Sequence, residues 1–310
     1  MKQSTDTLLM IRPASFRMNE ETAVNNYFQK KDDDAISANE MAQKEFDRFV
    51  VKLRQNDINV IVVEDDEKLD TPDALFPNNW VSFHENGTVG LYPMFAENRR
   101  RERREEVIEQ IEKHNHKVKN FIDYSDAEKD SVFLEGTGSL VLDRINKKAY
   151  CAVSERASED LLMEFCEDLE YFPILFQANQ SHKGKRLPIY HTNVMMCIGT
   201  DVAIIATSTI DDKQERKTVL ENLKNDGKKV IDISEEQMSN FAGNMLEVRN
   251  RSGKLYMVMS DQAKSVLSDK QREILEEHTG IISSDLSVIE KYGGGSARCM
   301  MAEVFLPKSD

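Results

Sequence analysis

One cysteine, one histidine and one glutamate stand where their side chains could do covalent chemistry. Cys299 follows three consecutive glycines and a short linker, and it comes just before a final apolar run, Met300 to Phe305. His191 lies just before another apolar run, and Glu135 lies between an apolar stretch and a Gly-x-Gly sequence. A cysteine nucleophile with a histidine and a carboxylate is the arrangement expected for covalent catalysis at an electrophilic carbon.

Each of these residues also has an ordinary structural interpretation. A free cysteine is often only a small core residue, and the three glycines could form a flexible loop before a strand. A reactive thiolate needs positive charge nearby, for which Arg298 and His191 are the candidates. The other histidines lie in predicted turns or helices and are assigned no role: His84, His114, His116, His182 and His278.

The elements that must position these residues repeat along the chain. Two short apolar runs joined by a turn, then a helix and a single buried strand, make one unit. The paired runs begin near residues 80, 140, 195 and 246, and their helices are predicted at 99–113, 158–168, 214–223 and 268–278. A strand at 8–11, a helix capped by Ser37 and running through Met41 to Leu53, a strand at 59–63 and the last apolar run complete a fifth unit.

This repeat predicts an α/β fold in which five ββαβ units close into a five-bladed propeller around a central cavity, rather than a doubly wound sheet. Repeats of about fifty residues are typical of arrays and propellers. We expect one domain over residues 1–310, because no linker composition divides the chain. The turns before the hairpins would meet at one end of the ring, where polar residues collect at 73–79, 134–139, 191–193 and 243–244.

The composition restricts the partners of the protein. The 310 residues include 41 Lys and Arg against 55 Asp and Glu, a formal net charge of −14, which disfavours nucleic-acid or anionic-membrane binding. The four cysteines form no CxxC pair, and neither a signal sequence nor a membrane span is predicted. We expect a cytoplasmic protein with no metal and no organic cofactor, since metal-ligand and phosphate-loop spacings are missing. The sequence leaves a homo-oligomer open.

As a set, the corner residues resemble those of the guanidino-group-modifying enzymes, the pentein superfamily of arginine deiminases, dimethylarginine dimethylaminohydrolases and amidinotransferases. Residues 73–79, Asp-Ala-Leu-Phe-Pro-Asn-Asn, are similar to the Asp-x-x-Phe-x-Glu/Asp-Asp corner of the dimethylarginine hydrolases. Glu135-Gly136 resembles the acidic-Gly corner, His191-x-Asn193 the catalytic histidine corner, and Cys299 the nucleophile. Residues 11–19 and 76–80 look most like the citrulline-utilisation branch. The resemblance covers essentially the whole chain.

The resemblance implies a role for each corner. Cys299 would attack the substrate carbon, His191 would protonate the leaving nitrogen and then activate water, and Glu135 would orient His191 and hold a substrate nitrogen. Arginine side chains at two corners would hold the α-carboxylate of an amino-acid substrate, although most of the run 99–104 should be a solvated helix face. The expected substrate-binding residues are Asp73, which would hold the head group, Phe76, Asn78, Asn79, Arg99 or Arg100, Arg156, Asn193 and Asn244.

Two corners depart from the arginine-deiminase pattern. Asn79 and Asn193 stand where deiminases hold the guanidinium with aspartates, and an amide pair suits a neutral ureido group better than a cation. We therefore expect hydrolysis of citrulline to ornithine, carbon dioxide and ammonia through an S-carbamoyl-cysteine.

Other functions stay open. Asp73 and Glu135 keep a guanidino substrate possible, so arginine deiminase, dimethylarginine dimethylaminohydrolase and amidinotransferase activities remain alternatives. A catalytically inactive binding propeller is the non-enzyme alternative, although it would have no reason to keep Cys299, His191 and Glu135 together. The polar segment 18–39 is either a lid over the cavity or a solvated loop.

Overall fold

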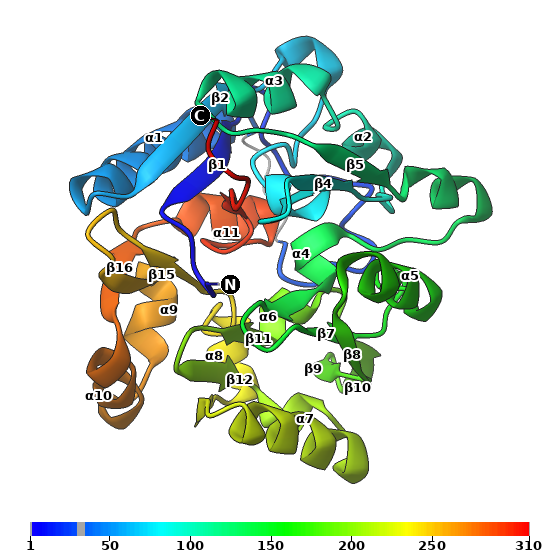
Figure 1. Cartoon of the computed structure of the whole chain (residues 1–310). Coiled ribbons are helices and arrows are strands. Elements are labelled where there is room, and N and C mark those ends of the chain that lie inside the picture. Colours follow the sequence, from blue (N-terminus) through cyan, green and yellow to red (C-terminus); the bar gives the residue numbers. More distant parts are fainter. Residues whose placement is uncertain (1, 30–34, 310) are drawn as a thin grey trace.

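The computed structural model describes residues 2–29 and 35–309. Within them the strands form five three-stranded sheets and one separate two-stranded hairpin. The central strand of each three-stranded sheet pairs antiparallel with one neighbour and parallel with the other. Figure 1 shows the sheets arranged about a common centre, with the long helices on the outside.

The strands follow the predicted units closely. In sheet order they are β17 (Ala302–Glu303), β1 (Thr7–Arg12) and β2 (Asn59–Glu64); β3 (Val81–Phe83), β4 (Thr88–Leu91) and β5 (Asn120–Asp123); β6 (Val141–Asp143), β7 (Lys148–Ala152) and β8 (Phe172–Phe176); β11 (Met196–Ile198), β12 (Val202–Ile205) and β13 (Lys229–Asp232); β14 (Leu246–Arg249), β15 (Leu255–Ser260) and β16 (Gly280–Ser284). The separate hairpin is β9 (Asn179–His182) with β10 (Lys185–Pro188).

The helices are of two kinds. Longer ones cross over between the parallel strands on the outside: α1 (Ala35–Gln55), α3 (Glu105–Lys113), α5 (Glu159–Leu169), α7 (Lys213–Asn225) and α10 (Asp269–His278). Shorter ones lie at corners or before strands: α2 (Glu97–Arg100), α4 (Gly136–Ser139), α6 (Thr192–Met195), α8 (Glu235–Ser239), α9 (Asp261–Val266) and α11 (Ser287–Gly293).

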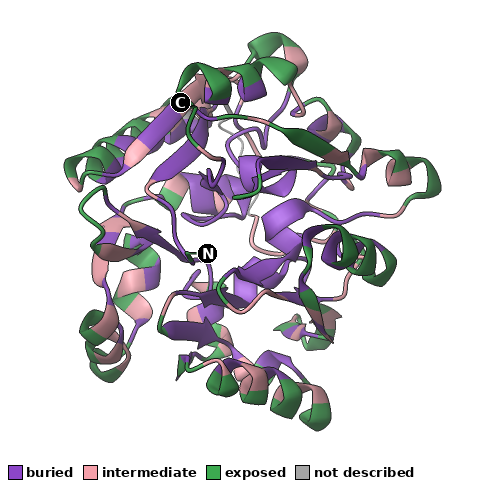
Figure 2. Ribbon diagram, viewed as in Figure 1, coloured by how far each residue is buried: buried purple, intermediate pink, exposed green. Residues whose placement is uncertain are grey.

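Burial follows the apolar periodicity that predicted these elements. Figure 2 shows buried strands toward the centre, whereas the outer faces of the helices are exposed. In α1 the side chains of Phe46, Phe49 and Leu53 are buried, as predicted. Met41 is 46% exposed, however, and Ser37 lies inside α1 rather than ahead of it, so those two predictions are wrong.

Several predicted boundaries also change. The charged helix at 99–113 is two helices, α2 and α3, separated at residues 101–104, because Glu102 turns inward to pair with Arg99. The last strand is only Ala302–Glu303. The three glycines do not form a simple flexible loop: Gly293 ends α11, and Gly294 caps that helix in the left-handed conformation, with φ 65°.

The two ends of the chain build one sheet. Strand β17 pairs antiparallel with β1, with Glu303 opposite Leu8, while β1 pairs in parallel with β2. The five sheets stay separate over the described residues, so no single closed sheet is formed there. Residues 30–34 of the polar segment 18–39, interpreted as either a lid or a solvated loop, lie outside the described residues. No helix among the described residues is long and apolar enough to cross a membrane.

Candidate active site

Four corners of the fold converge on one small cavity. Its volume is about 20 Å³, which is space for roughly one water molecule. Short elements supply the corners: a 3₁₀ turn at Pro77–Asn79, the start of α4, the start of α6 and the turn after α11. The lining residues are Thr22, Asn26, Asp73, Phe76, Asn79, Arg99, Arg156, Tyr190, His191, Gly293, Gly294, Gly295 and Cys299.

His191 and Glu135 form a tight buried pair. His191 Nε2 lies 2.7 Å from Glu135 Oε2, and the other carboxylate oxygen accepts the backbone N–H of Phe95 at 3.0 Å. Burial alone would raise the pKa of Glu135, but Arg156 Nη1 at 3.6 Å and the hydrogen bond to His191 outweigh burial and lower it. An ionised Glu135 only accepts, so His191 donates Nε2–H and its Nδ1 is the basic nitrogen.

Burial favours the neutral form of His191. Burial lowers its pKa below the ordinary 6.5, although the hydrogen bond to Glu135 opposes that change. Its ring also sits tightly against Gly138, where a Cβ atom would lie 2.8 Å from Nδ1 and 2.4 Å from Asn79 Nδ2. Only glycine at residue 138 allows the histidine and the asparagine to approach each other in this way.

Amide groups, rather than a cation, face the sulfur of Cys299. Asn244 Nδ2 donates to Sγ at 3.2 Å, and Asn193 Nδ2 lies 3.6 Å from it. The orientation of Asn244 is fixed because its Oδ1 accepts the backbone N–H of Arg298 at 3.1 Å. The Arg298 side chain instead pairs with Glu303 at 2.8 Å, so its predicted role beside the thiolate is wrong.

The opposite wall of the cavity carries Asn79, Arg99 and Asp73. Arg99 Nη1 donates to Asn79 Oδ1 at 2.8 Å, and a guanidinium has only donors, so the Asn79 oxygen must face Arg99. Asn79 Nδ2 is left buried with no hydrogen-bond partner among the described residues. Glu102 holds Arg99 in place with two hydrogen bonds of 2.9 Å.

Asp73 is buried, and only one of its two carboxylate oxygens accepts hydrogen bonds. Its Oδ2 accepts from Asn19 at 2.8 Å and from Thr22 at 3.3 Å, while Oδ1 has no partner among the described residues. Burial raises the pKa of Asp73, and Arg99, 4.0 Å away, opposes the rise. A substrate donor would satisfy this free oxygen.

The segment at residues 19–29 lines the cavity through Thr22 and Asn26. Arg156 lies over the rings of Phe95 and Tyr190, 5.3 and 5.0 Å from their centroids, and its Nη2 donates to Thr22 O and to Asn25 Oδ1. Tyr190 in turn donates to Gly294 O at 2.9 Å. These contacts hold the loop against the cavity.

The structure brings most of the predicted residues together. Cys299, His191 and Glu135 converge, as do Asp73, Phe76, Asn79, Arg99, Arg156, Asn193 and Asn244. Two predicted residues lie elsewhere. The Arg100 side chain points outward, with its Nε 3.4 Å from Glu128 Oε2. The Asn78 side chain lies outside the cavity lining, and its Nδ2 donates to Thr137 Oγ1. Of the two alternatives Arg99 and Arg100, it is therefore Arg99 that lines the cavity, and Asn78 does not line it.

Sequence reasoning missed the residues that support this site. Asn19 and Thr22 hold Asp73, Glu102 holds Arg99, and Tyr190 holds Gly294. The polar composition of the loop was a signal, but its partners are distant in sequence. Among the described residues no cluster of His, Cys, Asp and Glu could hold a metal ion.

Comparison with known proteins places this chain in a family. Residues 12–306 match the family model described as N,N dimethylarginine dimethylhydrolase, eukaryotic. The chain belongs to this family within the guanidino-group-modifying enzymes. The name of this family is that of a hydrolase. No curated protein matches its sequence.

Solved structures share its fold. The N-terminal domain of ArgZ, an arginine dihydrolase from the ornithine-ammonia cycle in Cyanobacteria, in a substrate-bound variant, is 16% identical over 97% of this chain and 99% of that chain, with a TM-score of 0.74. A dimethylarginine dimethylaminohydrolase adduct with S-methyl-L-thiocitrulline is 15% identical over 96% of this chain and 98% of that chain, with a TM-score of 0.62. At these identities the similarity establishes the α/β pentein fold.

Full-length ArgZ extends beyond the shared region. In its apo structure it is 17% identical over 97% of this chain, with a TM-score of 0.74, but the match spans only 41% of its own length. The chain therefore corresponds to about two fifths of that protein.

Proposed function

We propose that this protein hydrolyses the ureido group of citrulline, or of a closely related ureido amino acid, to an amine, carbon dioxide and ammonia. The observation that carries the proposal is the orientation of Asn79. Arg99 donates to its oxygen, which leaves an unpaired N–H₂ group on a side chain that lines the cavity.

The unpaired Asn79 Nδ2 group requires a hydrogen-bond acceptor on the substrate. A guanidinium group offers only donors, so it would leave Asn79 Nδ2 buried and unpaired. A ureido carbonyl oxygen is an acceptor and satisfies it. The free oxygens of Asp73 and Asn193 would accept from the ureido N–H groups. A ureido head group thus satisfies all three atoms, whereas a guanidinium satisfies two.

Cys299 is the proposed nucleophile and His191 the proton carrier. Neutral His191 takes the thiol proton, the thiolate attacks the ureido carbon, and His191 returns the proton to the leaving nitrogen, which departs as the ornithine amine. The resulting S-carbamoyl-cysteine is hydrolysed when His191 takes a proton from water. Carbamate leaves and decomposes to carbon dioxide and ammonia, and the proton on His191 restores the thiol. Glu135 stabilises His191 while it is charged.

Arg156 is the residue proposed for the α-carboxylate. Its Nε has no partner among the described residues, and its Nη2 is occupied only by loop acceptors that a carboxylate could replace. Arg99 is a weaker candidate, because Glu102, Asn79 and Phe76 O use most of its donors. We further propose that the five sheets are the blades of one propeller and one domain over 1–310, supported by the pairing of β17 with β1.

A second candidate is hydrolysis of arginine itself. The structural neighbour ArgZ is named an arginine dihydrolase, and a half-satisfied buried carboxylate at Asp73 suits a cationic head group. The two functions differ at Asn79, whose free donor disfavours a guanidinium.

An assay of ammonia and amine release separates the candidates. Citrulline, arginine, agmatine and dimethylarginine would be supplied in turn, with the Cys299→Ala variant as the blank. We expect ornithine and ammonia from citrulline and the highest kcat/KM for that substrate. Turnover of arginine or a methylarginine with no ornithine from citrulline would contradict the proposal.

A further inference from the structure

A second and larger cavity lies next to the candidate active site. Its volume is about 510 Å³, and its walls come from the loop at Tyr27 and Phe28, the β9–β10 hairpin, the segment after α8, and helices α9 and α11. The ring of Phe28 packs against Tyr190 at 6.3 Å between centroids, and Tyr190 lines the candidate active site. One loop therefore forms a wall of both cavities.

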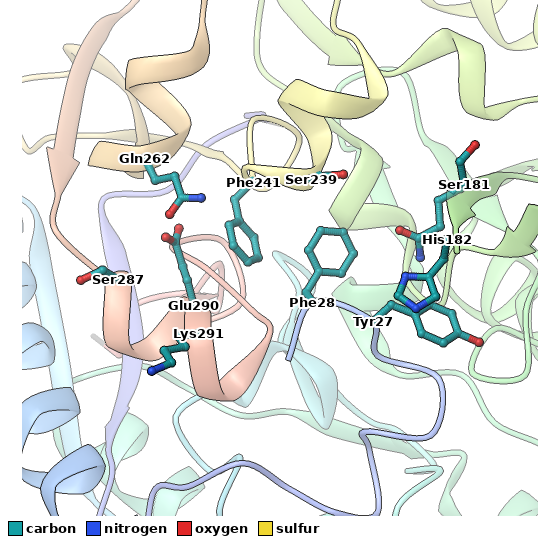
Figure 3. A pocket seen from close by; sticks show the side chains of 11 residues that line it. Tyr27, Phe28, Ser181, His182, Ser239, Phe241, Gln262, Ser287, Glu290 and Lys291 are labelled. Carbon is teal, nitrogen blue, oxygen red and sulfur yellow. The ribbon is translucent and has the colours of Figure 1, made fainter. Parts of the chain in front are cut away.

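Two buried polar groups that line this cavity have unused atoms. Glu290 is 3% exposed; the hydroxyls of Ser296 and Ser260 act to lower its pKa, but no hydrogen bond of normal geometry reaches its Oε2 from the described residues. Figure 3 shows its carboxylate pointing toward Gln262 and Phe241, away from Lys291. Gln180 is 6% exposed, with an equally unpaired Nε2. Buried polar atoms without a partner are uncommon, and a bound ligand is one cause of them.

The surroundings of Glu290 suit an organic cation with an apolar stem. The rings of Phe28 and Phe241 lie 5.3 Å apart between centroids, and Tyr27 stacks on His182 at 4.7 Å. Such faces attract ammonium groups and pack against methylene groups. The Lys291 ammonium lies over the ring of Tyr292, 4.9 Å from its centroid. Burial raises the pKa of Glu290 to about 7, and a cation beside it would restore its charge.

We propose that this cavity binds a primary amine as its alkylammonium ion, with the ammonium on Glu290 and the alkyl stem against Phe28 and Phe241. The net charge of −14 favours the approach of such a cation. Two sources share this chemistry: the amino-acid amine released by the proposed reaction, which rests on that function, and an unrelated alkylamine, which does not.

A ligand bound in this cavity would affect the turn that carries Cys299 through its contact with Ser296. Ser296 donates its hydroxyl to Glu290 Oε1 at 2.6 Å, and its carbonyl accepts the backbone N–H of Cys299 at 3.0 Å. An ammonium that draws Glu290 toward the cavity weakens the first of these bonds. The site is therefore connected to the turn that carries Cys299.

Calorimetric titration of the whole protein with butylamine and, separately, with ornithine tests the proposal. We expect saturable binding of at least one amine, weakened about ten-fold by Glu290→Gln, which loses one charged hydrogen bond. Glu236→Gln makes the same charge change at an exposed position of α8 and should leave binding unchanged. Gln262→Glu adds a carboxylate opposite Glu290 at an exposed position and should tighten binding, even if Glu290→Gln folds poorly.

The two amines distinguish the sources. Tighter binding of ornithine would indicate the reaction product, and tighter binding of butylamine an unrelated amine; either result supports the site. Absence of saturable binding, or binding that neither Glu290→Gln nor Gln262→Glu changes, would overturn it. A Cys299 alkylation rate that does not change on saturation with amine would contradict the connection through Ser296.

Discussion

At the scale of single residues, Asn79 controls the proposed choice of head group. Arg99 donates to its oxygen, and Glu102 holds Arg99 in place, so turning the Asn79 amide would break this hydrogen bond and set its N–H₂ group against the Arg99 donor. The amide itself does not determine which group it offers to a substrate. Arg99 determines it, because a guanidinium has only donors and therefore binds the Asn79 oxygen, which leaves the N–H₂ group for a substrate.

Replacing Asn79 with aspartate should change the substrate preference. The variant presents an acceptor where citrulline needs a donor, so kcat/KM for citrulline should fall by about ten- to a hundred-fold, as expected for about 1.5–3 kcal/mol of lost hydrogen bonding. Arginine should gain relative to citrulline. Asn79→Leu is the matched control, because it loses the donor without adding a charge and should not favour arginine. An unchanged citrulline-to-arginine ratio in Asn79→Asp would argue against the assignment.

The pH profile reports on His191. Burial holds its pKa below 6.5, and the proposed reaction begins with the neutral ring, so activity should be lost as pH falls through a midpoint below 6.5. Glu135 raises this pKa, hence Glu135→Gln should move the midpoint to still lower pH in whatever activity remains. The measurement is kcat/KM against pH. An acid limb with its midpoint above 6.5 would show that another group controls the reaction.

At the scale of elements, α11 positions the nucleophile, and α1 holds α11. Glu45 of α1 accepts the backbone N–H groups of Val288 and Ile289 at 3.0 and 3.1 Å. These are donors at the start of α11 that have no partner inside the helix. The other end of α11 is the Gly294 cap, which leads into the turn that carries Cys299.

Removing this contact should destabilise the protein. Glu45→Ala leaves helix donors buried and unpaired, and we expect a loss of about 1–3 kcal/mol in the free energy of unfolding. Glu45→Gln keeps an acceptor of the same shape and should lose less. Urea unfolding measures both variants. Equal stability of Glu45→Ala and the unsubstituted protein would show that α11 is held by packing alone.

Apolar periodicity predicted the strands and most long helices because burial imposes the same period on the sequence. It also predicted the corners, since polar residues there interrupt apolar runs. It could not reveal α11 as a helix, because α11 is only seven residues long and ends at a glycine. Nor could it pair Asn19 with Asp73, or show that Arg100 points away while Arg99 points inward. Those facts depend on tertiary contacts between distant residues.

At the scale of the whole molecule, the N-terminal segment joins separate sheets. Gln3 donates to Leu142 O at 2.8 Å and to Ile198 O at 3.1 Å, and it accepts the N–H of Arg144 at 2.8 Å. These partners belong to or border the sheets of β6 and β11, whereas Gln3 leads into β1. One side chain thus connects three sheets, alongside the sheet that β17 and β1 build from the two ends of the chain.

Gln3→Ala should therefore cost more stability than its position near the N-terminus suggests. Three buried backbone groups lose their partner, and we expect about 2–4 kcal/mol less free energy of unfolding. The Lys2→Ala variant changes an exposed side chain next to Gln3, and its free energy of unfolding should stay within about 0.5 kcal/mol of that of the unsubstituted protein. Chemical denaturation followed by tryptophan fluorescence compares them. Similar stabilities for the two variants would contradict a joining role for Gln3.

The most direct test of the proposed function is the mass of the covalent intermediate. The protein would be mixed with citrulline, quenched in acid during turnover, and analysed by intact mass and peptide mapping. Cleavage at the ornithine nitrogen predicts a single carbamoyl group on Cys299, none on Cys151, Cys166 or Cys197, and none in Cys299→Ala. The buried thiols of those three cysteines have pKa values raised to about 12, so they stay protonated. An adduct that retains the amino-acid chain, or modification by arginine but not by citrulline, would contradict the account.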